Sequence, residues 1–145
     1  MPILNYTTQI SVDKTISEIQ VALAKAGARA ILVDYGDNGE IKSLAFKMVV
    51  NENEIAFKLP AEPDKIFTLL KTQRGVPKKL QTMEQARRVA WRIIKDWVEA
   101  QLAIIETKMV KPDQVFLPYA ITRDGKTLYE SVIDGKVLLG DGNNG

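Results

Sequence analysis

The sequence contains no cysteine and no histidine among its 145 residues. Without cysteine, disulfide frameworks, thiolate zinc sites, iron–sulfur clusters and thiol nucleophiles are excluded, and a reducing, cytoplasmic compartment is favoured. Without histidine, the commonest general base and the commonest transition-metal ligand are both missing. Any catalysis would have to use carboxylates, lysine, tyrosine, serine or threonine. We therefore expect no cofactor and no metal site.

Long apolar runs are also missing, so the sequence predicts no membrane-spanning helix. The first residues lack a basic start, an apolar stretch and a cleavage site, so they predict no secretory signal. With 46% hydrophobic and 26% charged residues, the composition is that of one ordinary globular domain. We expect a single domain over residues 1–139 and a flexible tail over the glycine- and asparagine-rich residues 140–145.

The hydrophobic pattern predicts an α+β fold with the order β-α-β-β-β-α-α, followed by an irregular C-terminal region. Predicted strands cover residues 4–10, 30–35, 41–50 and 55–59. Capping patterns and helical spacing predict helices over residues 15–27 and 82–107, and a short helix between Pro63 and Gly75. Residues 115–121 have an extended pattern, and residues 127–133 fit a strand or a helix. We expect an antiparallel sheet meander with helices on one face.

The long predicted helix carries two adjacent apolar seams. One seam consists of Ala86, Ala90, Ile93, Trp97, Ala100 and Ile104, and the other of Trp91, Ile94, Val98, Leu102 and Ile105. Two seams indicate that the helix is covered on two sides, by the sheet and by either another part of the chain or a second subunit of a homodimer. The candidate interface residues for a protein partner are Trp91, Ile94 and Val98.

Basic residues concentrate between residues 71 and 95. This window holds eight basic residues against one acidic residue, a net charge of +7, in a chain whose net charge is +2. On the long helix, opposite charges four residues apart are predicted to pair. These predicted pairs are Glu84–Arg88, Arg92–Asp96 and Lys95–Glu99. The basic residues left without such a partner are Lys71, Arg74, Lys78, Lys79 and Arg87.

These five unpaired residues predict contact with an anionic partner. They cluster around residues 75–79 and the start of the long helix, and a basic loop leading into a helix N-terminus can hold phosphate. We therefore predict nucleic-acid binding by this set, with a solvated basic loop as the alternative. Arg87 falls on the apolar flank of the helix. Its head group either extends past the edge of the core, lies over Trp91, or points out of a cleft.

One pattern resembles the acidic motif of Mg-dependent nucleases, in which two carboxylates hold a metal beside a lysine. Asp113, Asp124 and Lys126 would supply these groups. In that motif the second acid lies on a strand, whereas Asp124 followed by Gly125 is more typical of a turn. We therefore expect no enzyme activity, with a carboxylate nuclease as the alternative.

Two segments resemble small uncharacterised proteins of phages and bacterial mobile elements. They are QARRVAWRIIKDWVEAQ at residues 85–101 and VFLPY at residues 115–119. Together with the helix at residues 15–27, the resemblance covers most of the chain. That family has no assigned activity, so the resemblance implies a genetic setting and no mechanism. We expect a non-enzymatic accessory protein that binds nucleic acid; the alternative is a protein–protein interaction module, such as an inhibitor of a host defence complex.

Overall fold

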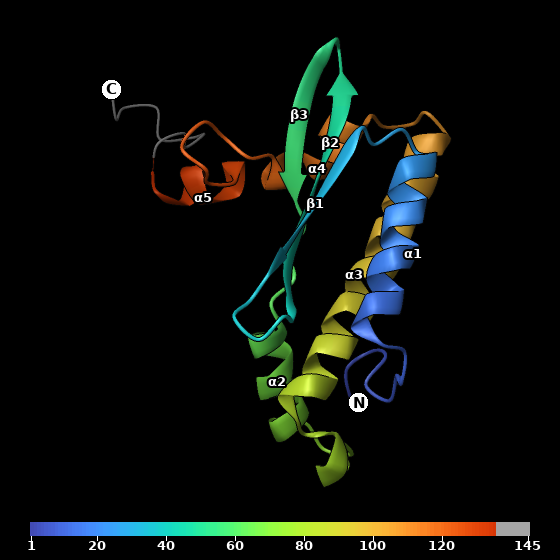
Figure 1. The fold of residues 1–145 in the computed structure, drawn as a ribbon, viewed down its shortest axis with the longest axis vertical. Helices are drawn as coiled ribbons and strands as arrows, with labels where there is room; N and C mark the ends of the chain where they lie inside the picture. Colours follow the sequence, from blue (N-terminus) through green and yellow to red (C-terminus); the bar gives the residue numbers. More distant parts are fainter. Residues whose placement is uncertain (136–145) are drawn as a thin grey trace.

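The computed structural model describes residues 1–135, so the predicted tail at residues 140–145 lies outside the described residues. The longer elements are α1 (Val12–Lys25), β1 (Ala30–Tyr35), β2 (Ile41–Val50), β3 (Asn53–Lys58), α2 (Pro63–Thr72) and α3 (Met83–Glu106). Figure 1 shows the antiparallel sheet β1-β2-β3 beside the paired helices α1 and α3. The α+β fold is confirmed. Among the described helices, none combines the length and apolarity needed to cross a membrane.

The sheet alternates core-facing and exposed side chains. On β2, Leu44, Phe46 and Met48 are buried, whereas Lys47 and Val49 are exposed on the opposite face. Near the end of β1 the register shifts by one residue. Because of this shift Ile41, the first residue of β2, also faces the core. The predicted bounds of β1 and β2 are confirmed, and β3 begins two residues earlier than predicted.

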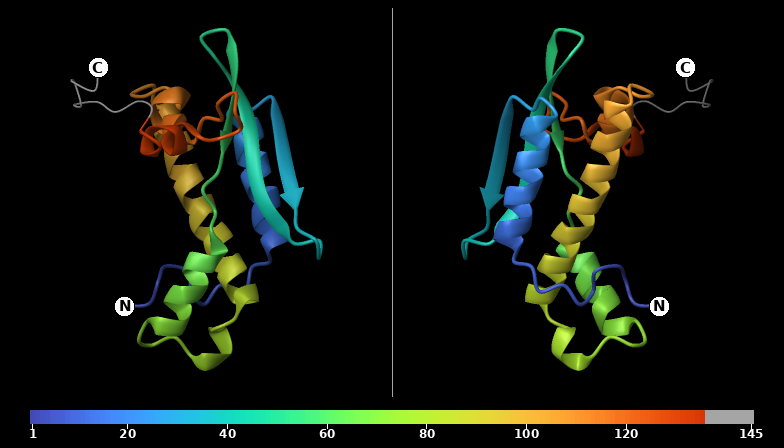
Figure 2. Two further views of the ribbon diagram at one scale, coloured as in Figure 1. Left: turned by 90° about the vertical axis from the view of Figure 1, so that its left-hand side faces the viewer. Right: turned by 90° about the vertical axis from the view of Figure 1, so that its right-hand side faces the viewer.

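Helices α1 and α3 lie side by side behind the sheet (Figure 2). α1 begins after Ser11, whose hydroxyl oxygen accepts a hydrogen bond from the Lys14 backbone N–H at 3.1 Å. Thr15, the predicted cap, is buried inside the helix and accepts a hydrogen bond from Arg92 at 3.2 Å. The same guanidinium pairs with Glu18 at 2.7 Å, so the predicted pair with Asp96 is replaced by a contact between the two helices.

The predicted strand at residues 4–10 is absent, because this segment forms turns. Asn5 has a φ of 66°, which interrupts an extended backbone. The side chain of Gln85, 2% exposed, donates from Nε2 to the carbonyl oxygens of Tyr6 at 2.8 Å and Thr8 at 2.9 Å. A buried amide therefore satisfies backbone groups that a neighbouring strand would otherwise bind, and the segment crosses the helices instead of joining the sheet.

The C-terminal region packs on the domain through short helices. Residues 115–121, predicted to be extended, instead contribute to α4 (Pro112–Phe116) and the 3-10 turn η2 (Leu117–Tyr119). The Phe116 ring is fully buried, and its centroid lies 5.3 Å from that of Phe46 and 5.7 Å from that of Trp97. Residues 127–133, which fitted a strand or a helix, form α5 (Leu128–Ile133) after a capping box.

The seam containing Trp91, Ile94 and Val98 faces the core. These side chains are 0%, 8% and 0% exposed and pack with the buried side chains of the sheet. They are not accessible to a partner, so the predicted interface at these residues is wrong: a heptad-like apolar pattern fits an internal contact as well as an external one. Over the first half of α3, the second cover comes from α2, whose Leu70 packs against Ala86.

Candidate nucleic-acid interface

The connection between α2 and α3 forms one end of the molecule, below the sheet in Figure 1. α2 ends where Gln73 adopts an extended conformation. Gly75 follows with a φ of 90°, a conformation that other residues rarely adopt. A 3-10 turn, η1 (Lys78–Leu80), leads to Thr82, whose side chain accepts a hydrogen bond from the Gln85 backbone N–H and starts α3. The chain thus reverses direction within a short, irregular segment.

Internal contacts hold this connection in place. Val76 is buried and Leu80 is partly buried in a small apolar cluster between α2 and α3. The side chain of Gln81 donates to the Val76 carbonyl at 3.1 Å. The Ile3 backbone N–H donates to the side-chain oxygen of Gln73 at 2.7 Å, which ties the N-terminal segment to the same end of the molecule. These contacts hold the inner side of the connection against the protein, and they leave its basic side chains facing solvent.

Four predicted binding residues project from the last turn of α2 and from this connection, and we call them the basic tip. Their members are Lys71, Arg74, Lys78 and Lys79. All four are exposed, and none forms an ion pair with any residue that the structure describes. The Lys71 ammonium lies 4.1 Å from the centroid of the Phe67 ring, a cation–π contact that leaves its charge uncompensated. No acidic residue occurs between residues 65 and 83.

Most basic residues further along α3 are neutralised. The predicted pairs of Arg88 with Glu84, at 3.5 Å, and of Lys95 with Glu99, at 3.0 Å, are confirmed. Arg92 is paired with Glu18 of α1, as described above. The charge excess of the basic window is therefore concentrated on the basic tip and on Arg87.

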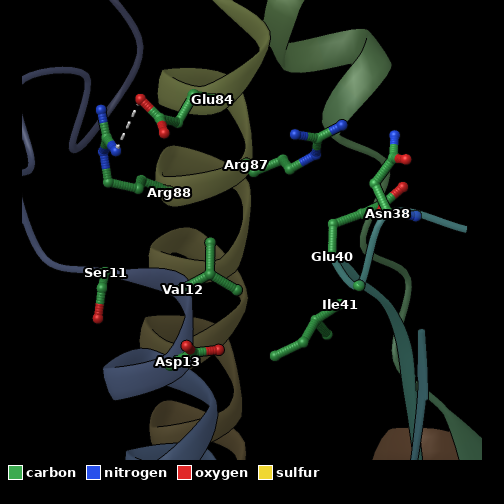
Figure 3. A pocket seen from close by; sticks show the side chains of 10 residues that line it. Ser11, Val12, Asp13, Asn38, Glu40, Ile41, Glu84, Arg87 and Arg88 are labelled. Atoms are coloured by element: carbon green, nitrogen blue, oxygen red, sulfur yellow. Dashed lines mark hydrogen bonds and ion pairs between the residues drawn. The ribbon is translucent and has the colours of Figure 1, made fainter. Parts of the chain in front are cut away.

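Arg87 lies apart from the basic tip. Figure 3 shows its side chain extending from α3 toward Asn38 and Glu40 of the turn between β1 and β2, across a cleft of about 400 Å³. The side chain is partly buried, and Asp13 and Glu84 also line the cleft. Of the three predicted positions, the cleft is the one observed. Because its side chain points into this cleft beside the β1–β2 turn, Arg87 does not extend the surface formed by the other four residues.

Asp124, one of the two carboxylates of the nuclease alternative, forms its hydrogen bonds within its own turn. Asp124 lies in the predicted turn, which Gly125 completes with a φ of 85°. Hydrogen bonds from the Thr122 hydroxyl and the Lys126 backbone N–H lower the pKa of Asp124. The side chain of Lys126 is engaged by Asp134 at 2.6 Å, which raises the pKa of that lysine. In the described residues, no three acidic side chains come together to hold a metal ion.

No protein-family model matches the chain, and neither a curated protein nor a solved structure is significantly similar to it. Function must therefore be inferred from the surface of the chain itself. The described surface offers one concentrated, uncompensated charge of a single sign at an ordered site, and that is the basic tip.

Proposed function

We propose that the protein is a non-enzymatic accessory protein that binds nucleic acid through the basic tip. The observation that carries the proposal is the exposure of Lys71, Arg74, Lys78 and Lys79 at one end of the molecule, with no acidic residue between residues 65 and 83. Such a surface attracts phosphates and releases the counterions condensed on them. A setting in a phage or bacterial mobile element is part of the proposal and rests on the resemblance of residues 85–101 and 115–119.

The apolar content of the tip favours nucleic acid over a protein partner. Between residues 65 and 83, a stretch that is described throughout, no large hydrophobic side chain is exposed. Protein interfaces bury aromatic and other apolar side chains at their centre and are depleted of lysine. Interfaces with nucleic acid are more polar and strongly positive. The tip also has three lysines to one arginine, which suits contacts to phosphate charge more than bidentate contacts to base edges.

The experiment is a salt titration of binding. Fluorescence anisotropy would measure the affinity for duplex DNA, single-stranded DNA and RNA of equal length. About four phosphate contacts predict a slope of log affinity against log salt of roughly −3 to −4 on duplex DNA. Raising the salt from about 50 to about 200 mM should therefore weaken binding by about 100-fold.

Arg87→Ala serves as the matched control for this titration. Because Arg87 faces the cleft at the β1–β2 turn, its removal should leave the slope unchanged. Removing any one residue of the basic tip should instead reduce the slope by about one. Failure of all three nucleic acids to bind at the lowest salt would refute the proposal, as would binding that is insensitive to salt.

A further inference from the structure

The two edges of the sheet are protected unequally. Beyond β3, Ala120 forms a bridge with Phe57, and the Ile121 backbone N–H donates to the Ala56 carbonyl at 2.8 Å. Beyond β1, no strand or bridge is present among residues 1–135. Figure 2 shows β1 as the outermost strand, with α1 behind the sheet. The edge of β1 is therefore open to another chain.

The register shows which backbone groups face this open edge. The Leu59 N–H donates to the Leu44 carbonyl at 2.9 Å, so the backbone groups of Leu44 face β3. Since hydrogen-bonding directions alternate along an antiparallel strand, residues 43, 45 and 47 of β2 face β1. Their partners in β1 are Asp34, Leu32 and Ala30. The residues between these partners, Ile31 and Val33, therefore direct their N–H and C=O groups toward the open edge.

The side chains of residues 30–33 of β1 lack the usual protection of an edge strand. Edge strands commonly carry lysine or proline, which block pairing with another strand. β1 has the sequence AILVDY and contains neither residue. Ile31 and Val33 are only partly buried at the margin of the core, and Leu32 is 62% exposed on the outer face of the sheet. An added strand would cover apolar side chains on both faces.

We propose that β1 pairs with β1 of a second copy of this chain, antiparallel and about a two-fold axis through Leu32. In this register Ile31 of each copy lies opposite Val33 of the other, and the outward N–H and C=O groups of both residues are satisfied. Leu32 lies opposite Leu32 of the second copy in a pair without backbone hydrogen bonds, where side chains are closest. The pairing would continue the sheet from three strands to six.

The positions of Asp34 and Arg29 favour this register over its neighbours. Asp34 lies directly opposite Ala30 of the second copy, so its carboxylate is opposed neither by a like charge nor by a large exposed apolar side chain. Moving the axis to Val33 would place the exposed Leu32 opposite a carboxylate. Moving it to Ile31 would place the Arg29 guanidinium opposite Val33. This surface is independent of the basic tip, and its test does not depend on nucleic-acid binding.

Because the chain contains no cysteine, single cysteines can test the pairing directly. The matched variants are Leu32→Cys on β1 and Val49→Cys on β2, both exposed on the outer face of the sheet. Cα atoms in pairs without backbone hydrogen bonds are about 4.5 Å apart, which suits a disulfide. Under mild oxidation at micromolar concentration, Leu32→Cys should form covalent dimers at least about tenfold faster than Val49→Cys.

Sedimentation equilibrium provides a second measurement that needs no cross-link. Wild-type protein should show twice its chain mass of 16.2 kDa. Val33→Pro removes an outward N–H that β2 does not use, so it should remain folded by circular dichroism and sediment as a monomer. The proposal is overturned if Leu32→Cys cross-links no faster than Val49→Cys. It is also overturned if the wild-type protein sediments at 16.2 kDa at concentrations up to about 100 μM. In that case the open edge of β1 would be expected to pair with an extended segment of a different protein.

Discussion

Changing Lys71, Arg74, Lys78 and Lys79 together to alanine is expected to weaken nucleic-acid binding by at least about 100-fold at low salt. Non-specific affinity comes almost entirely from the counterions released at phosphate contacts, so removing all four contacts removes most of the driving force. The four side chains are exposed and form no ion pair within the described residues, so the fold should survive the change. Anisotropy would measure the affinity, and circular dichroism would confirm folding.

The control for this variant removes the same charge elsewhere. It changes the exposed residues Lys14, Lys42, Lys58 and Lys108 to alanine, none of which forms an ion pair in the described structure. Because these lysines lie outside the basic tip, on α1, on the sheet and after α3, their loss should weaken binding by no more than about threefold. Equal losses in the two quadruple variants would show that overall charge, and not the basic tip, governs binding.

Gln85→Glu is expected to lower the free energy of unfolding by about 3 kcal/mol. The change preserves the shape of a side chain that is 2% exposed, but it removes the two N–H donors that reach the carbonyls of Tyr6 and Thr8. Arg88 still pairs with the other side-chain oxygen, which it contacts at 2.9 Å in the wild type. The loss therefore comes from a carboxylate oxygen placed against two carbonyl oxygens in a buried site.

Urea denaturation would measure the stability of this variant, with Gln9→Glu as the control. Gln9 is exposed and belongs to the same N-terminal segment, so the identical chemical change there should shift the free energy of unfolding by less than about 0.5 kcal/mol. Amide exchange would show whether residues 1–10 open first in Gln85→Glu. Equal stability of the two variants would mean that the Gln85 amide does not hold this segment.

Local signals predicted most of the fold. The bounds of α3 follow from its cap at Thr82 and its long apolar period, and those of β1 and β2 from alternation on both sides of a polar turn. The segment at residues 4–10 has the same alternation but no strand beside it. Its backbone is bound by Gln85, which is 77 residues beyond Thr8, and no local pattern encodes such a contact. In the sequence, this contact is indicated by Gln85 itself, a polar residue on the apolar face of the predicted helix.

Four of the five predicted binding residues lie together in the basic tip, whereas the fifth, Arg87, lies apart from them. The basic tip follows from a local charge excess, which sequence alone displays. The direction of Arg87 depends on the β1–β2 turn packing opposite α3, a contact between distant segments. The burial of Trp91 and Val98 likewise depends on which neighbour covers α3, because an apolar seam has the same appearance against a sheet, a helix or a partner.

The most direct test of the basic tip as the binding surface is a heteronuclear NMR titration with a short DNA duplex at low salt. We predict saturable shifts that are largest for the backbone amides of residues 71–81, with small shifts for α1 and for the outer face of the sheet. Shifts concentrated around Lys42, Lys47 and Lys58 on that outer face would contradict the proposal. So would a spectrum that does not change while the duplex is added in excess.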